Sequence, residues 1–133
     1  MRIVLLGQPI TKKNSQRIIT VRGHPVIIPS AQYKAYEAAC LEQIRYMYHM
    51  EPISGRVNLQ CLYYMQTRRL VDLVNLLEGT QDILVNACVL SDDNNEIVFG
   101  VDGSRVLYDK ENPRVEITIT AEGEEENVQE KTV

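Results

Sequence analysis

The chain changes from a strand-like to a helix-like pattern within the stretch RRLVDLVNLLE, residues 68–78. Two arginines end an alternating run, and Asp72 then opens an amphipathic helix that we expect to continue to about Asn86. A second acidic pair, Asp92 and Asp93, follows this helix. A helix and its exit loop can bring such acids back toward each other, with the arginines at the rim. Carboxylates arranged in this way are typical ligands of Mg²⁺ beside a phosphodiester.

The same acids also fit a purely structural interpretation. An aspartate at the start of a helix is a favoured N-cap, and two aspartates followed by asparagine are typical of a turn. On the residues alone, Asp72, Asp92 and Asp93 are therefore compatible with a metal site and equally with ordinary capping and turn formation.

Hydrophobic periodicity divides the rest of the chain into short strands and one further long helix. Residues 57–66 alternate most regularly and predict a strand with one buried face. Ser30 is a good N-cap for a helix over residues 31–50. Residues 10–17 are polar and cationic and predict a loop. Further strands are expected at residues 3–6, 18–21, 25–28, 96–101, 104–108 and 114–120.

The order of these elements predicts the fold class. Asp102-Gly103 is a strong signal for a two-residue hairpin turn, so we expect the last three strands to form a β-meander. Strands and helices are mixed, and hairpins are frequent. We therefore predict an α+β domain with a single mixed β-sheet, two main helices packed mainly on one face, and a C-terminal β-meander.

The net charge of −4 belongs to the end of the chain. The last 12 residues carry five glutamates and one lysine, which leaves 13 basic and 13 acidic residues in the first 121. We expect a globular domain over residues 1–121 and a disordered acidic tail over residues 122–133. The acidity of the whole chain therefore does not exclude a nucleic-acid partner, because the basic residues of the domain are clustered.

Several function classes are not favoured by the sequence. The apolar opening of the chain is too short for a signal peptide core, and we expect no transmembrane segment and a cytoplasmic location. Cys40, Cys61 and Cys88 are too widely spaced for a zinc site and too few for a disulfide framework.

Several ordered motifs together resemble the RusA family of Holliday junction resolvases, in particular its phage and prophage branch in Gram-positive bacteria. The motifs are GQPITKKNSQR at residues 7–17, RRxxDLxNL at 68–76, DxL at 82–84, VLxDD at 89–93 and NPRVEI at 112–117. The resemblance covers roughly residues 1–120. It implies a homodimeric, Mg²⁺-dependent endodeoxyribonuclease that nicks four-way DNA junctions symmetrically.

The resemblance also implies roles for individual residues. The first carboxylate of the family pattern falls on Asp72 and the third catalytic acid on Asp93. The second carboxylate falls on Val74, which cannot be a ligand, and the catalytic lysine falls on Glu78. Because Val74 and Glu78 are four residues apart on one helix face, Glu78 is placed to reach toward the position of the missing carboxylate.

The candidate site is completed by cations. We take Asp72, Asp93 and Glu78 as catalytic candidates and Asp72, Asp93 and Asp92 as ligands of Mg²⁺, with Mn²⁺ as the alternative ion. Arg68 and Arg69 are expected to contact phosphate, and Lys12, Lys13 and Arg17 to form a flexible clamp. The full set of candidate DNA-binding residues is Lys12, Lys13, Asn14, Arg17, Arg68 and Arg69.

Three functions remain open on this basis. The first is a structure-selective endonuclease that resolves four-way junctions in recombination and repair. The second is a protein of the same fold that binds branched DNA without cutting it, which Val74 and Glu78 favour. The third is a small structural or interaction protein that does not contact DNA, which the overall acidity would suit.

Overall fold

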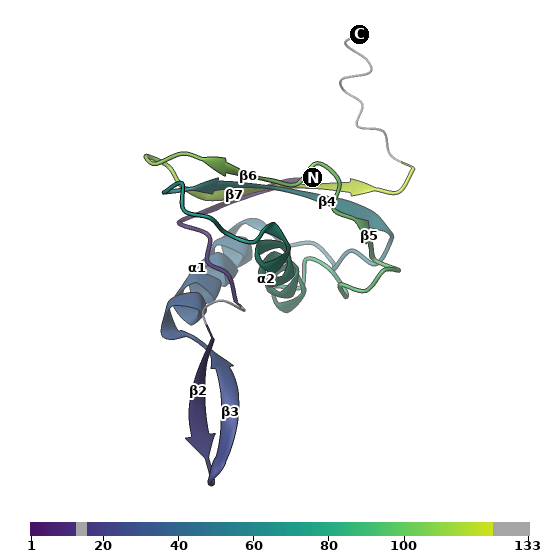
Figure 1. Ribbon diagram of the computed structural model, residues 1–133. Helices are drawn as coiled ribbons and strands as arrows, with labels where there is room; N and C mark the ends of the chain where they lie inside the picture. The colour runs from purple at the N-terminus through teal and green to yellow at the C-terminus, as the bar shows by residue number, and fades with distance from the viewer. Residues whose placement is uncertain (13–15, 124–133) are drawn as a thin grey trace.

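The computed structural model of the chain describes residues 1–12 and 16–123. In these residues a mixed five-stranded sheet carries both helices on one face, and a two-stranded hairpin projects beyond the helices (Figure 1). The elements are β1 (Arg2–Leu6), β2 (Gln16–Val21), β3 (His24–Pro29), α1 (Ala31–Met47), β4 (Val57–Met65), α2 (Leu73–Asn86), β5 (Val98–Gly100), β6 (Arg105–Tyr108) and β7 (Arg114–Ala121). The α+β class is confirmed, and so are the mixed sheet and its two helices. The hairpin forms a second, separate sheet.

The central strand of the large sheet is β4, with β7 antiparallel on one edge and β5 and β6 parallel on the other. Its side chains alternate between buried and half-buried, as the sequence predicts. Leu59, Cys61 and Tyr63 are fully buried in the core. The Tyr63 hydroxyl is hydrogen-bonded to Thr80 Oγ1 of α2 at 2.6 Å. This buried bond fixes α2, with Asp72 at its N-terminus, relative to the sheet.

The predicted C-terminal β-meander is wrong. β5 and β6 do not pair with each other but follow one another along the same edge of β4. β7 lies on the opposite edge, between β4 and β1, so it is not a neighbour of β6. The signal at Asp102-Gly103 marks a break between two collinear strands, rather than a hairpin.

Side chains hold this break in place. Asn58 Nδ2 donates to the Asp102 carbonyl at 3.2 Å, and Asn58 Oδ1 accepts from the Asp102 N–H at 2.9 Å. Ser104 Oγ accepts from the Cys61 N–H at 3.0 Å and donates to the Leu59 carbonyl at 3.3 Å. Where the backbone ladder is interrupted, these bonds satisfy the Cys61 N–H and the Leu59 carbonyl of β4. Gly103 has a φ of +86°.

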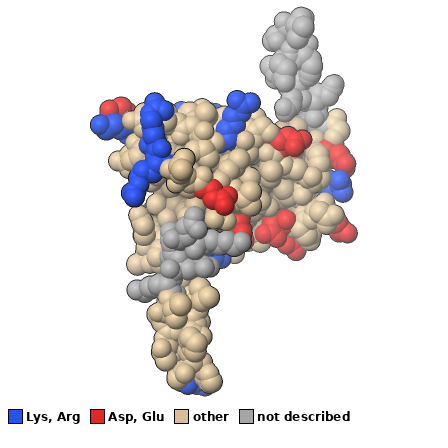
Figure 2. Space-filling view, in the orientation of Figure 1, with Lys and Arg blue, Asp and Glu red and all other residues tan. Residues whose placement is uncertain are grey.

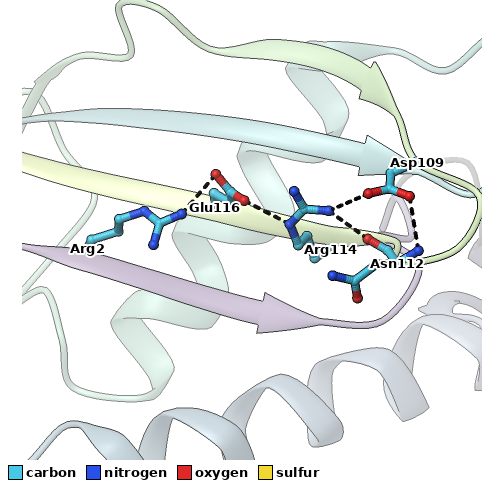
Figure 3. Close-up of polar contacts among 5 residues, drawn as sticks. All are labelled: Arg2, Asp109, Asn112, Arg114 and Glu116. Carbon is cyan, nitrogen blue, oxygen red and sulfur yellow. Dashed lines mark hydrogen bonds and ion pairs between the residues drawn. The ribbon is translucent and has the colours of Figure 1, made fainter.

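The outer face of the sheet carries a chain of charged side chains (Figure 3). Arg114 on β7 binds Asp109 Oδ2 at 2.9 Å and Glu116 Oε2 at 2.8 Å, and Arg2 binds the other oxygen of Glu116 at 3.0 Å. The Arg114 guanidinium also lies over the ring of Tyr64, 3.9 Å from its centroid. Hydrogen bonds from Arg114 lower the pKa of both Asp109 and Glu116. This network joins β1, β7 and the end of β6 on the face opposite the helices.

Replacing Arg114 should make folding less sensitive to acid. The folded pKa values of Asp109 and Glu116 lie below their unfolded values of about 4. Their contribution to stability is therefore present above pH ~4 and is lost as the pH falls through the folded values. In urea unfolding at pH 7 and pH 3, Arg114→Met should lose less stability on acidification than the unaltered protein. Arg105→Met, at an exposed position of β6, is the matched control. Equal acid losses in Arg114→Met and the unaltered protein would contradict this account.

Most element boundaries agree with the sequence prediction, with small differences. α1 ends at Met47 rather than near Met50. The predicted loop over residues 10–17 is wrong at its end, because β2 already begins at Gln16. Glu122, assigned to the tail from the sequence, binds Arg56 at 3.0 Å. Residues 124–133 lie outside the described part, so the disordered tail stays a prediction. No helix in the described ranges is long and apolar enough to cross a membrane.

Candidate functional site

Asp72 lies at the N-terminus of α2. Its Oδ1 accepts hydrogen bonds from the backbone N–H groups of Val74 at 2.9 Å and Asn75 at 3.4 Å. The N-cap interpretation is therefore confirmed. Both bonds go to Oδ1, and Oδ2 accepts no hydrogen bond from the described part of the chain. Capping thus leaves the second oxygen of this carboxylate for another ligand.

Asp92 and Asp93 lie on the loop after α2, and the start of this loop is firmly anchored. Val89 and Leu90 are buried, and backbone bonds on both sides of Leu90 join the loop to Ile53. The Asp93 N–H donates to Asp92 Oδ1 at 2.7 Å. The pKa of Asp93 is raised, first by partial burial, then by its hydrogen bond to Asp92 and by the negative charges of Asp82 and Asp92. Asp93 therefore lies near two other carboxylates, those of Asp92 and Asp82.

Asp82 is the residue that sequence reasoning missed. It was noted only as part of the DxL motif, yet the structure brings it within electrostatic range of Asp93. Its Oδ2 binds Lys12 Nζ at 3.2 Å, and both side chains are about one-third exposed. The available signal was the spacing of Asp82, four residues beyond Glu78 on the same face of α2. The ion pair holds Lys12 against α2 beside the acids, whereas the sequence placed it in a flexible clamp.

Val74 and Glu78 differ in their surroundings. Val74 is 68% exposed on the first turn of α2, so the position of the missing carboxylate faces solvent. Glu78 is half-buried, one turn further along. The pKa of Tyr33 on α1 is raised by burial and then by the charges of Glu37, Asp82, Cys40 and Glu78. Glu78 and Asp82 therefore both lie near the seam between α1 and α2.

The oxygen donors of Asp72, Asp92 and Asp93 are of the kind that Mg²⁺ binds. Within residues 1–12 and 16–123, no three His, Cys, Asp or Glu side chains form a ready-made metal site. Mg²⁺, however, commonly binds one or two protein carboxylates and takes its remaining ligands from water and substrate phosphate. The raised pKa of Asp93 fits a cation-binding role, because a nearby cation would relieve the repulsion from Asp82 and Asp92. The donor set therefore fits Mg²⁺ or Mn²⁺ through oxygen ligands.

Arg68 and Arg69 are exposed at the end of β4 and border two surface grooves. Arg68 lies over the ring of Tyr108, 4.0 Å from its centroid, which fixes its guanidinium beside a groove of about 480 Å³. Arg69 also borders a second groove of about 430 Å³, lined by Gln8, Thr11 and other residues. Figure 2 shows basic side chains gathered at this end of the large sheet and acidic side chains over α2 and its exit loop. Cationic and acidic surfaces thus lie side by side, as phosphodiester chemistry requires.

Part of the predicted clamp lies outside the residues that the structure describes. Lys13 and Asn14 are not among the described residues, and Arg17 belongs to β2 but its side chain is not described. Of the predicted cations, Lys12, Arg68 and Arg69 are placed by the structure. Lys12 is held near the acids by Asp82, and the arginines border the grooves beside the start of α2.

Comparison with known proteins agrees with the resemblance noted from the motifs. The sequence model described as endodeoxyribonuclease RusA matches residues 7–120, from the turn after β1 to the last residues of β7. No curated protein matches the chain. The matched region includes α2, both acidic segments, Arg68 and Arg69. The chain therefore belongs to the RusA family of Holliday junction endodeoxyribonucleases.

Proposed function

We propose that this chain itself nicks four-way DNA junctions in a Mg²⁺-dependent reaction, with Asp72 and Asp93 as its essential acids. The observation that carries the proposal is the position of Asp93. It lies on the loop that follows the helix capped by Asp72, and its pKa is raised first by partial burial and then by the neighbouring acids Asp92 and Asp82. Carboxylates with a raised pKa beside other acids are typical of sites that bind a cation or transfer a proton.

Each residue of the site has a proposed task. Asp72 and Asp93 would hold the ion, Mg²⁺ or alternatively Mn²⁺, with Asp92 or Glu78 as a further oxygen donor. When bound, the ion supplies an activated water and a positive charge beside the phosphate. Arg68 and Arg69 would orient the phosphodiester from the grooves at the end of β4. Lys12, held by Asp82, would add a cation where negative charge develops, on the side of α2 that lacks the family lysine.

The DNA contacts would be chiefly to the backbone. The first 36 residues contain six basic residues and no acidic one, which favours contact with phosphate. The proposed contact residues are Lys12, Lys13, Asn14, Arg17, Arg68 and Arg69. No base-reading helix is apparent in the sequence, so shape would decide the choice of substrate. We further propose a homodimer, because two opposed nicks need two sites related by a two-fold axis. The expected setting is recombination and repair of phage or prophage DNA in a bacterial cytoplasm.

A second candidate is a protein that binds junctions without cutting them. It is favoured by the exposed Val74, which stands where the family has its second carboxylate. The described residues also contain no three-acid group of the kind that would preform a metal site. In this case Asp72 would act only as a helix cap, and Asp92 and Asp93 only as part of a turn.

A nicking assay separates these candidates. An end-labelled synthetic four-way junction and a linear duplex of the same sequence are incubated with the protein in Mg²⁺, in Mn²⁺ and in EDTA. We expect metal-dependent nicks on the junction alone, at symmetric positions. Junction binding in EDTA with no nicks in either metal would support the second candidate. An absence of both binding and nicking would leave a structural protein that does not use DNA.

A further inference from the structure

The β2–β3 hairpin contributes only Arg17, near the start of β2, to the candidate site. It projects beyond α1 and α2, and its main contacts are between its own two strands (Figure 1). Its turn is formed by Arg22 and Gly23 at positive φ, 53° and 82°. A two-stranded hairpin is marginally stable by itself in water. A hairpin of this kind therefore needs a surface to pack against.

The side chains of the hairpin indicate what kind of surface this is. Ile18 and Ile27 are cross-strand partners on one face and are 70% and 63% exposed. Val21 and Val26 are 46% and 38% exposed. Residues 16–29 contain two arginines, one histidine and no acid. Because aliphatic side chains occupy the middle of both strands, the hairpin fits an apolar protein surface better than a phosphate backbone.

The chain itself offers such a surface on the exposed side of α1. Ala35, Ala39, Glu42 and Tyr46 follow one another along one face of the helix, and all four are exposed. Tyr46 is 88% exposed and borders a largely apolar groove of about 670 Å³, together with Met47 and Glu42. The alanines let a neighbouring backbone approach closely, and the groove lies at the end where they stop.

We infer that the hairpin is an exchanged arm, which packs along the exposed face of α1 of a second copy of this chain. This rests on the homodimer proposed above and specifies its interface. β3 ends at Pro29 and α1 begins at Ala31, so in each protomer the hairpin is connected directly to the helix that receives the hairpin of the other protomer. In a two-fold dimer the contact is made twice, each arm lying on the helix of the other protomer. Such an interface covers both arms and both helix faces at once.

The lengths of the two elements agree with this arrangement. Strands of six residues extend about 20 Å, and a 17-residue helix is about 25 Å long. When the β3–α1 connections of the two protomers lie side by side, the tip of the hairpin with Arg22 reaches the last turns of the partner's α1. Glu42 lies in that groove, and the helix C-terminus adds partial negative charge. Of the two acids of α1, Glu37 is half-buried and lies outside the groove, so the exposed Glu42 is the one that Arg22 can pair with, beside Arg45.

Sedimentation velocity over a concentration series tests the arm, without reference to cleavage. The double variant Ile18→Ser, Ile27→Ser should weaken dimerisation by at least about a hundredfold. Its circular dichroism spectrum should still show the helix and strand content of a folded large sheet and two helices. Val106→Ser, at an exposed apolar position of β6, should leave the dimer intact. A monomeric unaltered protein at all concentrations overturns the inference, as does a dimer that is insensitive to the double serine variant.

A charge swap identifies the receiving surface. Arg22→Glu and Glu42→Arg should each weaken the dimer by about three- to tenfold, and the double variant should recover most of the loss. No recovery would overturn the assignment to α1. If the serine variant loses junction affinity but the protein is a monomer throughout, the arm is a DNA contact and the inference is wrong. Failure of the nicking assay leaves these measurements unaffected, so the arm and the proposed activity can fail separately.

Discussion

Asp72→Asn and Asp93→Asn are each expected to lower the rate of junction nicking by at least about a thousandfold, while junction binding is retained. Asparagine keeps the shape of the side chain and removes its charge. At position 72 its carbonyl oxygen can still accept the hydrogen bonds from Val74 and Asn75, so α2 keeps its N-cap. The effect on cleavage then reports on the ligand role of the carboxylate and not on helix stability.

The Asp93 variant has a second expected result, because the pKa of this acid is raised in the folded protein. Ionisation of a group with a raised folded pKa costs stability as the pH rises above its unfolded value of about 4. Removing the charge removes this cost at neutral pH. Asp93→Asn should therefore melt no lower than the unaltered protein in EDTA, and Mg²⁺ should stabilise it less.

The measurements are single-turnover nicking in Mg²⁺, gel-shift binding in EDTA, and thermal melting with and without Mg²⁺. Asp102→Asn is the matched control, since this exposed aspartate lies at the break between β5 and β6 and outside the candidate site. Cleavage by Asp72→Asn at the unaltered rate would show that Asp72 is only a cap. The same result for Asp93→Asn would remove the loop acids from the site.

Restoring the family pattern should raise activity. Val74→Asp combined with Glu78→Lys is expected to nick at least about tenfold faster than the unaltered protein, because it returns a carboxylate and a cation to one face of α2. Val74 is 68% exposed, so the change does not disturb the core, and an acid in the first turn suits the helix N-terminus. The assay is the same single-turnover reaction, with melting curves to confirm that α2 remains folded.

The single variants decide what Glu78 does. If Glu78 replaces the missing ligand, Glu78→Ala should lower the rate of junction nicking and weaken its dependence on Mg²⁺. Glu78→Gln should have the same effects with less change in packing. If the unaltered protein never cuts but the double variant does, the chain is a junction-binding protein whose cleavage activity the two substitutions restore. A double variant slower than the unaltered protein would show that the present side chains form a different working site.

The elements that could be predicted from the sequence are those determined by residues that are close together along the chain. Alternation over residues 57–66 predicted β4, and the Asp72 cap followed by an apolar stripe predicted α2. The C-terminal strands were predicted with the wrong pairing because a turn signal such as Asp102-Gly103 is local. The pairing itself depends on Asn58 and Ser104, whose partners lie more than 40 residues away along the chain.

The site was predictable to a similar extent. Asp72, Asp92 and Asp93 stood out because acids flank a helix, and the structure places Asp72 at its N-terminus and the other two on the loop that follows it. The pairing of Lys12 with Asp82 could not be predicted, because 70 residues separate them and neither has a local signal for the other. The Arg68 contact with Tyr108 was hidden for the same reason. The catalytic and DNA-binding roles themselves remain predictions until the variants above are measured.

The position of β7 has a consequence for how the protein is made. β7 pairs with both β1 and β4, and the Met1 amino group donates to the Ile119 carbonyl at 3.1 Å. During synthesis, the first strand therefore has no partner in the large sheet until the strand at residues 114–121 has left the ribosome. Long-range pairing of this kind slows folding, and the open edges of β1 and β4 are exposed to other chains meanwhile. The large sheet can therefore be completed only once β7 is available to pair with both β1 and β4.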